Sequence, residues 1–230
     1  MNIPDANPRG LAIKFHGGDG SETDLVTHSF NGFPVADADG FGQLMRAIGA
    51  SGPGAPKPTP IERFLAEHPA AKTFLTTQKP PPESYATASY FGVNAFKFID
   101  AKGHESFVRY RFVPKAGEHY LDATALAGKG PNYLVDEIPL RVAKAPVQFD
   151  WYAQIAGPGD VIDDPTIAWP ESRRLVKLGT LTIDHAVANQ EAASKALLFL
   201  PSRVPAGIEP ADPMIGVRSA AYPISFSGRQ

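Results

Sequence analysis

Short segments in which apolar and polar side chains alternate are the feature that most constrains the fold. Alternation with a period of two is typical of a strand that buries one face. Glycine-containing turns at residues 17–20 and 101–103 join two pairs of these segments as hairpins. Because a hairpin joins strands that run in opposite directions, the pattern favours antiparallel pairing. The segments with this pattern are residues 11–16, 23–30, 90–99, 105–113, 147–155, 176–183 and 196–200.

Helices are expected between some of these strands, and two of their starts are marked by capping residues. Asp39 is a candidate N-cap for a helix that ends at about Gly49. Thr59, Pro60 and Glu62 combine an N-cap, a proline in the first helical position and a capping-box glutamate. These signals predict one helix before and one after the proline- and glycine-rich connector at residues 51–60.

Prolines are expected to divide the helical segments. The second helix should pause at Pro69 and stop before the three prolines at 80–82, and Pro139 should kink a helical stretch within residues 122–144. No break in composition marks a domain boundary. The sequence therefore predicts an α+β fold, with an antiparallel β-barrel core and flanking helices, as a single domain over residues 1–230.

The composition is that of an ordinary globular protein, and it excludes several kinds of site. Of 230 residues, 43% are hydrophobic and 20% are charged, with a formal net charge of −2. That charge provides no basic field for nucleic acid, and no apolar run is long enough for a membrane span. The chain has no cysteine, so disulfides, zinc thiolates, iron–sulfur clusters and cysteine nucleophiles are excluded.

The first residues contain neither the basic nor the apolar stretch of a signal peptide. Both a cytoplasmic and a periplasmic location therefore stay open.

A repeat of three residues near the C-terminus suggests the first candidate site. Met214, Arg218 and Tyr222 are spaced four residues apart and would share one face of a helix. A guanidinium one turn from a phenol favours the phenolate, which is useful as an anionic oxygen ligand for a metal. The ordinary alternative is a solvated Arg–Tyr pair on a terminal helix. Pro223 disfavours helical conformation at Tyr222, so the helix is expected to end there.

Histidine and acidic residues give weaker signals. His28 lies in a predicted strand and is followed by several phenylalanines, so it could face an aromatic pocket; a core or surface histidine is the alternative. The acidic residues around Asp19 lack the spacing of an EF-hand. The chain contains no zincin, P-loop or α/β-hydrolase motif.

Several ordered motifs resemble those of the catalase superfamily, and in particular the small catalase-like haem peroxidases. Residues 207–210 read Gly-Ile-Glu-Pro, and Arg218 to Pro223 follow the pattern Arg, three residues, Tyr-Pro. Residues 8–15, Asp-Leu-Val at 24–26, residues 90–98 and Trp-Pro at 169–170 are similar to further catalase motifs. The resemblance extends from about residue 4 to residue 229.

The resemblance implies a set of haem-binding residues. Tyr222 would be the proximal ligand of the iron in haem b, Arg218 its charge partner and Arg229 a propionate contact. The other residues that the resemblance places in the haem pocket are Phe33, Phe41, Phe199 and Met214.

Two departures from the catalase pattern are expected to affect catalysis. His28 stands where catalases have a distal Asn, and Asn94 stands where they have a His on the ligand side; both are candidate catalytic residues. The distal His of the family belongs to sequence upstream of the match at residues 8–10. The resemblance thus implies an N-terminally incomplete haem domain, with His28 as the one substitute base and with slow peroxide turnover.

The expected function is that of a haem peroxidase that reduces hydrogen peroxide or organic hydroperoxides with a small-molecule reductant. A homo-oligomer is compatible with this interpretation. Two alternatives stay open: a haem carrier or sensor that has lost turnover, and a β-barrel that binds an apolar ligand without haem.

Overall fold

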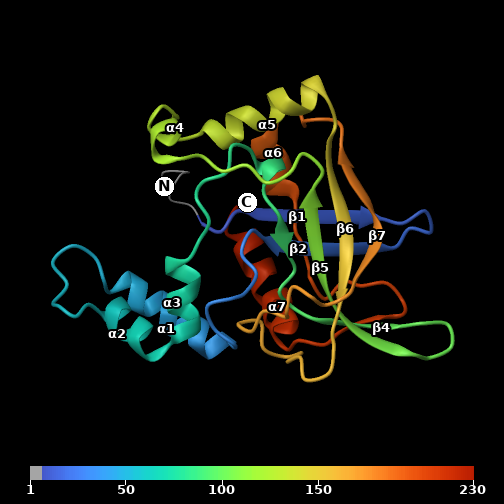
Figure 1. The fold of residues 1–230 in the computed structure, drawn as a ribbon, viewed down its shortest axis with the longest axis horizontal. Coiled ribbons are helices and arrows are strands. Elements are labelled where there is room, and N and C mark those ends of the chain that lie inside the picture. Colours follow the sequence, from blue (N-terminus) through green and yellow to red (C-terminus); the bar gives the residue numbers. More distant parts are fainter. Residues whose placement is uncertain (1–6) are drawn as a thin grey trace.

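One curled antiparallel sheet organises the chain. The computed structural model describes residues 7–230. All paired strands run antiparallel, in the order β1-β2-β3-β5-β4-β8, with β6 pairing β5 and β7 pairing β6 (Figure 1). The strands are β1 (Gly10–His16), β2 (Glu22–His28), β3 (Tyr90–Phe91), β4 (Phe96–Ile99), β5 (Glu105–Pro114), β6 (Val147–Ile155), β7 (Leu175–Ile183) and β8 (Ile208–Pro210).

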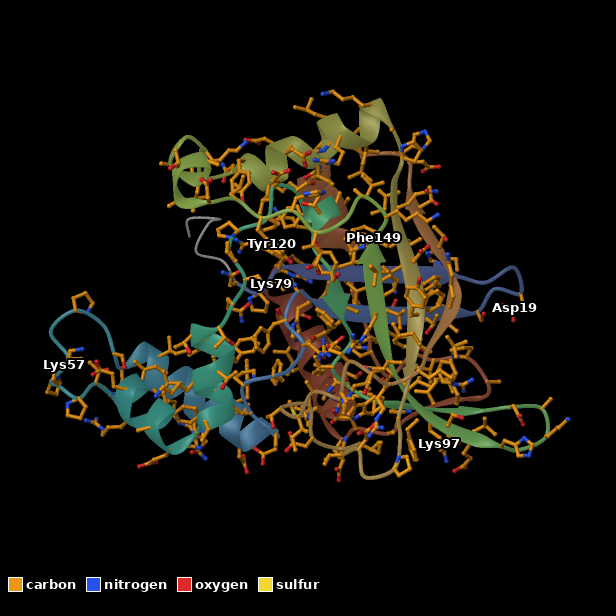
Figure 2. The ribbon with its side chains drawn as sticks, in the orientation of Figure 1. Asp19, Lys57, Lys79, Lys97, Tyr120 and Phe149 are labelled. Atoms are coloured by element: carbon orange, nitrogen blue, oxygen red, sulfur yellow. The ribbon has the colours of Figure 1, made fainter. Side chains whose placement is uncertain are left out.

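The predicted hairpins are present. β1 pairs β2 from Gly10↔His28 to His16↔Glu22, and Gly20 adopts the positive φ of 82° that closes the turn. Asp19 lies at the tip of this hairpin, whereas Phe149 of β6 lies among the strands (Figure 2). Asp19 is exposed because it belongs to the turn, whereas Phe149 is buried because every second side chain of a strand faces the core.

The main core fills the concave side of the sheet with aromatic and branched side chains. β5 is its centre, because it pairs with β3 and β4 along one edge and with β6 along the other. Its inward residues Val108, Tyr110 and Phe112 are buried. Trp151 stacks on Phe112, with ring centroids 5.9 Å apart, and contacts Tyr110 at 5.8 Å. This packing makes the sheet a rigid wall for the elements that cover it.

Helices flank the sheet in two groups (Figure 1). Three helices form a separate apolar cluster around Val35, Leu44, Phe64 and Ala71, away from the sheet. α4 and α5 lie across one end of the strands, and α7 lies beside β1 and β2. The helices are α1 (Ala38–Gly49), α2 (Pro60–Glu67), α3 (Pro69–Thr76), α4 (Ala123–Ala127), α5 (Tyr133–Lys144), α6 (Gln190–Ala196) and α7 (Met214–Ser227), with a 3-10 turn, η2, at Tyr85–Thr87.

One of the two predicted caps is confirmed and the other is wrong. The capping box of α2 is complete, with Thr59 and Glu62 each bonding the other's backbone N–H. The N-cap of α1 is Asp37, whose Oδ1 accepts the Gly40 N–H at 2.8 Å, and the predicted cap Asp39 lies in the first turn. Both aspartates can accept such a bond, and the start of the helix selects the earlier one.

Two predicted strands need correction. The segment 90–99 is interrupted at Gly92, whose Cα lies so close to Tyr110 that an added Cβ would be 3.3 Å from the Tyr110 Cβ. The interruption frees Asn94 from strand pairing. Residues 196–200 are not a strand: Asn189 caps the short helix α6, which ends at Ala196. Sequence analysis also missed β8, which pairs with β4.

The C-terminal helix does not end at Tyr222 as predicted. α7 continues through Pro223 to Ser227, whose Oγ donates to the Pro223 carbonyl at 3.1 Å. A proline inside a helix removes one backbone donor, and the turns on either side keep their own hydrogen bonds. Among residues 7–230, no helix is long and apolar enough to cross a membrane.

Candidate functional site

Tyr222 lines a cavity of about 400 Å³ between α7 and the first hairpin. β1 and β2 contribute Ala12 and Val26, which are partners in the strand register. Small and branched side chains at these positions leave room above the strands. Phe199 and Arg229, both predicted haem contacts, also line the cavity. The remaining lining residues are Ser194, Leu197, Leu198 and Ser225.

The wall that carries Phe199 is fixed to β2 by a buried carboxylate. Asp24 is fully buried; its Oδ2 accepts the Leu200 N–H at 2.7 Å and its Oδ1 pairs with Lys14 Nζ at 2.6 Å. Lys14 Nζ in turn lies 5.6 Å from the centroid of the Phe199 ring. Thr23 Oγ1 donates to the Arg203 carbonyl at 2.7 Å. These contacts hold the loop after α6 against the hairpin and so set the width of the cavity.

A continuous hydrogen-bond network leads from the Tyr222 oxygen into the core. Arg218 Nε donates to Tyr222 Oη at 2.7 Å, and Arg218 Nη1 donates to Asn94 Oδ1 at 2.6 Å. Asn94 Nδ2 donates to Asp212 Oδ2 at 2.8 Å, and Asp212 Oδ1 accepts the Met214 N–H at 2.9 Å. The helical spacing of Arg218 and Tyr222 brings the first pair together, as predicted. Asn94 reaches them from the break between β3 and β4.

The network holds the Arg218 guanidinium against the Tyr222 oxygen, and Asn94 links that guanidinium to the buried carboxylate of Asp212. Asp212 is 1% exposed, and burial raises its pKa, whereas the Asn94 hydrogen bond and the charges of Arg109 and Arg218 oppose that shift. Arg218 can only donate, so Tyr222 Oη is an acceptor in this bond. A phenol oxygen that accepts a charge-assisted hydrogen bond keeps a further lone pair for a Lewis acid.

His28 lies at the end of β2 in an aromatic enclosure. Its ring centroid is 6.2 Å from that of Phe33 and 6.1 Å from that of Phe74, and Phe33 stacks on Phe41 at 5.9 Å. Burial, followed by the positive charge of Arg218, lowers the His28 pKa from 6.5 to about 4. The imidazole is therefore neutral at neutral pH.

Comparison with known proteins identifies the family. The family model described as catalase matches residues 4–229, which is nearly the whole chain. The chain belongs to the catalase family. It is 39% identical to a catalase-related peroxidase of Mycolicibacterium paratuberculosis over 225 residues, which cover 96% of this chain and 71% of that protein. A catalase-related peroxidase of Synechococcus elongatus is 36% identical over 228 residues, covering 97% and 67%.

Solved catalases share the fold of this catalase-family chain. A fungal catalase superposes with a TM-score of 0.85 at 22% identity, over 99% of this chain and 49% of that one. Catalase A of Saccharomyces cerevisiae superposes with a TM-score of 0.83 at 20% identity, over 99% and 50%. The chain thus spans about half the length of these catalases, and the α+β fold predicted from its sequence is confirmed.

The structure divides the predicted site residues of this catalase-family chain into two groups. Phe33 packs beside His28 and Phe41 stacks on Phe33, and none of these three residues is among those that line the Tyr222 cavity. Met214 is buried at the start of α7, where its backbone N–H bonds Asp212, and it is also absent from the cavity lining. Asn94 lies on the Tyr222 side, so its contacts are those of a residue that positions Arg218.

Asp212 is the residue that sequence analysis missed. It precedes α7 by two residues, a position where an aspartate commonly accepts a backbone N–H at the start of a helix. That signal indicates a capping role and nothing more. Its second contact, with Asn94, joins positions 118 residues apart and has no local sequence pattern.

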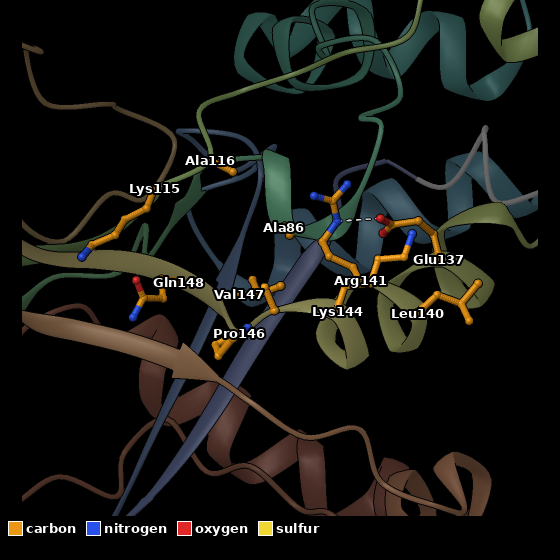
Figure 3. Close-up of a pocket in the computed structure, with 11 residues that line it drawn as sticks. Ala86, Lys115, Ala116, Glu137, Leu140, Arg141, Lys144, Pro146, Val147 and Gln148 are labelled. Carbon is orange, nitrogen blue, oxygen red and sulfur yellow. Dashed lines mark hydrogen bonds and ion pairs between the residues drawn. The ribbon is translucent and has the colours of Figure 1, made fainter.

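The Tyr222 cavity is smaller than another cavity of this structure, so volume alone does not identify the functional site. A larger cavity of about 590 Å³ lies between α5 and the start of β6 (Figure 3). Arg141 and Lys144 line it, and Arg141 Nε pairs with Glu137 Oε1 at 2.5 Å. None of the predicted haem residues lines this cavity. Among the described residues, no group of three or more His, Asp or Glu side chains could hold a bare metal ion.

Proposed function

We propose that this catalase-family chain is a haem peroxidase that reduces hydrogen peroxide or an organic hydroperoxide, with Tyr222 as the proximal ligand of haem b. The observation that carries the proposal is the Tyr222 oxygen, which lines a cavity while Arg218 donates a hydrogen bond to it at 2.7 Å. The names of the relatives, catalase and catalase-related peroxidase, support peroxide as the substrate class.

The residues present fit a haem group. A cavity of about 400 Å³ lies in the range of pockets for large organic ligands. Ala12, Val26 and Phe199 offer apolar surface to a flat macrocycle. Arg229 lines the same cavity and is exposed; it donates to the Leu197 carbonyl at 3.3 Å and lies 5.7 Å from the centroid of the Phe226 ring. No carboxylate of the described residues pairs with it, so its guanidinium is suited to a carboxylate of a ligand.

Each residue has a definable task in this proposal. Arg218 neutralises the phenolate charge of Tyr222, and Asn94 and Asp212 hold the guanidinium in its orientation. Bound haem supplies the redox chemistry, in which a peroxide O–O bond is reduced by two electrons and two protons to water or to an alcohol and water. A small-molecule reductant supplies those electrons. The strands and the loop at Phe199 exclude bulk water.

Replacing the proximal oxygen tests the proposal directly. Tyr222→Phe keeps the ring and removes the ligand atom, so haem titration of this variant should fail to give the tyrosinate-type visible spectrum of the wild-type chain. Tyr152→Phe is a matched control, because Tyr152 lies outside the cavity lining and its oxygen makes, within the described part of the chain, one long bond of 3.5 Å, to Asp150. Equal spectra and haem stoichiometry for Tyr222→Phe and wild type would refute the assignment. Haem binding without peroxide consumption would favour a carrier or sensor.

A further inference from the structure

The larger cavity, between α5 and the start of β6, has a positively charged lining, although the chain as a whole carries a formal net charge of −2 (Figure 3). Its charged lining residues are Lys115, Arg141, Lys144 and Glu137. At neutral pH lysine and arginine are protonated and glutamate is ionised, so three positive charges face one negative charge. The lining therefore favours an anionic ligand.

The one carboxylate of the lining holds the Arg141 guanidinium in a fixed orientation. Ser84 is fully buried, and its Oγ accepts the Ala86 N–H at 3.0 Å at the start of η2. The same Oγ donates to Glu137 Oε2 at 2.5 Å, and Glu137 Oε1 accepts from Arg141 Nε at 2.5 Å. The core thus fixes Glu137, and Glu137 fixes Arg141. Support of this kind from a buried residue is what a precise binding site requires.

The two cations of α5 keep donors that have no partner among the described residues. Arg141 uses Nε for Glu137, whereas its Nη1 and Nη2 make no hydrogen bond there. Lys144 lies one turn later on the same face of α5 and has no carboxylate partner in the described part of the chain. Two free terminal nitrogens of a guanidinium match the two oxygens of a carboxylate.

Lys115 reaches the cavity from the opposite side. It follows β5, and its backbone N–H donates to the Gln148 carbonyl of β6 at 2.9 Å. Its Nζ lies 3.9 Å from Asp150 Oδ1, which is long for an ion pair, and Asp150 has a closer partner in Lys177 at 2.7 Å. Figure 3 shows Lys115 at one end of the cavity and the two cations of α5 at the other. The carbonyl groups of a helix C-terminus attract cations, which accounts for basic residues in the last turn of α5 but not for Lys115.

Apolar surface separates the two charged ends. Ala86, Pro146 and Val147 lie between them in Figure 3. Leu140, which also lines the cavity, keeps 65% of its surface exposed. The volume of about 590 Å³ is in the range of pockets that bind small organic molecules. The cavity thus offers a positive group at each end and an apolar floor between them.

We propose that this cavity binds an elongated organic dianion, a molecule with an acidic group at each end and an apolar body, of the dicarboxylate class. Arg141 and Lys144 bind one acidic group, Lys115 binds the other, and the apolar body contacts Pro146 and Val147. The cavity shares no lining residue with the Tyr222 cavity, so the proposal does not depend on haem or on peroxide reduction.

Isothermal titration calorimetry of the whole haem-free chain with succinate, adipate and suberate tests this proposal. Each dicarboxylate is compared with the monocarboxylate of the same length. A second charge-assisted contact should make the best dicarboxylate bind about ten-fold more tightly than its monocarboxylate. Equal affinities, or no binding of any dicarboxylate, would overturn the proposal. Inorganic pyrophosphate is the compact dianion of the test, and tighter binding of pyrophosphate than of every dicarboxylate would also overturn it.

Substitutions distinguish a defined site from a general attraction of anions to the surface. Lys115→Met removes the charge at one end and keeps most of the side chain, so the dicarboxylate should then bind no more tightly than the monocarboxylate. Lys144→Met should weaken the binding of both ligands, because it acts at the end where a single carboxylate binds. Lys102→Met is the matched control, because Lys102 is exposed in the β4–β5 turn outside the cavity. An equal loss of affinity in Lys102→Met and Lys115→Met would overturn the proposal.

Discussion

The Tyr222 side and the His28 side of this site differ in how completely their polar groups are bonded. On the Tyr222 side, Arg218, Asn94 and Asp212 satisfy one another and the phenol oxygen. On the β2 side, His28 Nε2 has no partner within the described residues and is enclosed by phenylalanine rings. The contrast teaches that the chain holds the Tyr222 oxygen in place with its own side chains, whereas it encloses His28 Nε2 without giving it a partner among the described residues.

Removal of Arg218 should have the largest effect on haem binding, because Arg218 bonds both Tyr222 and Asn94. Truncating one member of a buried, hydrogen-bonded charge pair typically costs about 3–5 kcal/mol, which corresponds to at least a hundred-fold loss. Arg218→Leu should therefore weaken haem binding by that factor at pH 7, measured by Soret titration. Arg141→Leu is the control, because Arg141 has an i,i+4 carboxylate partner but lines the other cavity. Similar haem affinities for both variants would contradict the comparison.

Acid should lower the free energy of unfolding because of His28. The unfolded histidine binds a proton below pH 6.5, whereas burial keeps the folded one neutral down to about pH 4. The unfolded state thus binds more protons in this window, and stability falls as pH falls, by about 3 kcal/mol over the window.

Urea unfolding of wild type and His28→Leu at pH 7 and pH 4.5 measures this contribution. The comparison of the two chains is needed because burial raises the Asp212 pKa, and that group gains stability as pH falls. The wild-type chain should lose more stability than the variant. A parallel loss in the two chains would show that the His28 ring is protonated in the folded state.

Replacing Asn94 should give an intermediate effect. Asn94→Leu removes one partner from Arg218 and one from the buried Asp212, and each unsatisfied group costs about 1–3 kcal/mol. Stability should fall by that amount, and the haem spectrum should change because Arg218 is no longer held. Adding Asp212→Leu should restore part of the stability, since no buried carboxylate is then left unpaired. Purely additive losses would argue that the two side chains do not interact.

A substitution far from both Tyr222 and His28 should change the stability of the fold and leave haem binding unchanged. Thr59→Ala removes the N-cap of α2, which is typically worth about 1 kcal/mol. The free energy of unfolding should fall by that amount, whereas haem affinity should equal that of wild type. A change in haem affinity would show that α2 and its neighbours are coupled to the site.

Local patterns predicted the parts of the molecule that local interactions hold. The hairpin of β1 and β2, the capping box at Thr59 and the contact of Arg218 with Tyr222 all depend on residues close in the chain. The motif resemblance added Phe199 and Arg229, and the structure places both at the cavity. Their roles, like that of Tyr222, stay predictions.

The errors fall where distant residues decide the structure. The strand at 90–99 is interrupted where Gly92 lies against Tyr110 of β5, and β8 pairs with the edge of β4. Phe33 packs with His28 because the α1–α3 cluster holds it there, and Phe41 stacks on Phe33. None of these contacts has a periodic signal. The same holds for the bond of Asn94 with Asp212, on which the orientation of Arg218 depends.

The tethers between the first hairpin and the loop after α6 have a consequence for folding. The Leu200–Asp24 bond spans 176 residues and the Thr23–Arg203 bond spans 180. Contacts of such sequence separation form late, because a long loop must close before they contribute. On a ribosome that adds roughly 5–20 residues per second, β2 emerges about 10–40 s before α7. The hairpin face that carries Val26 and His28 must stay uncovered for that interval, so insertion of the proposed haem belongs at the end of synthesis.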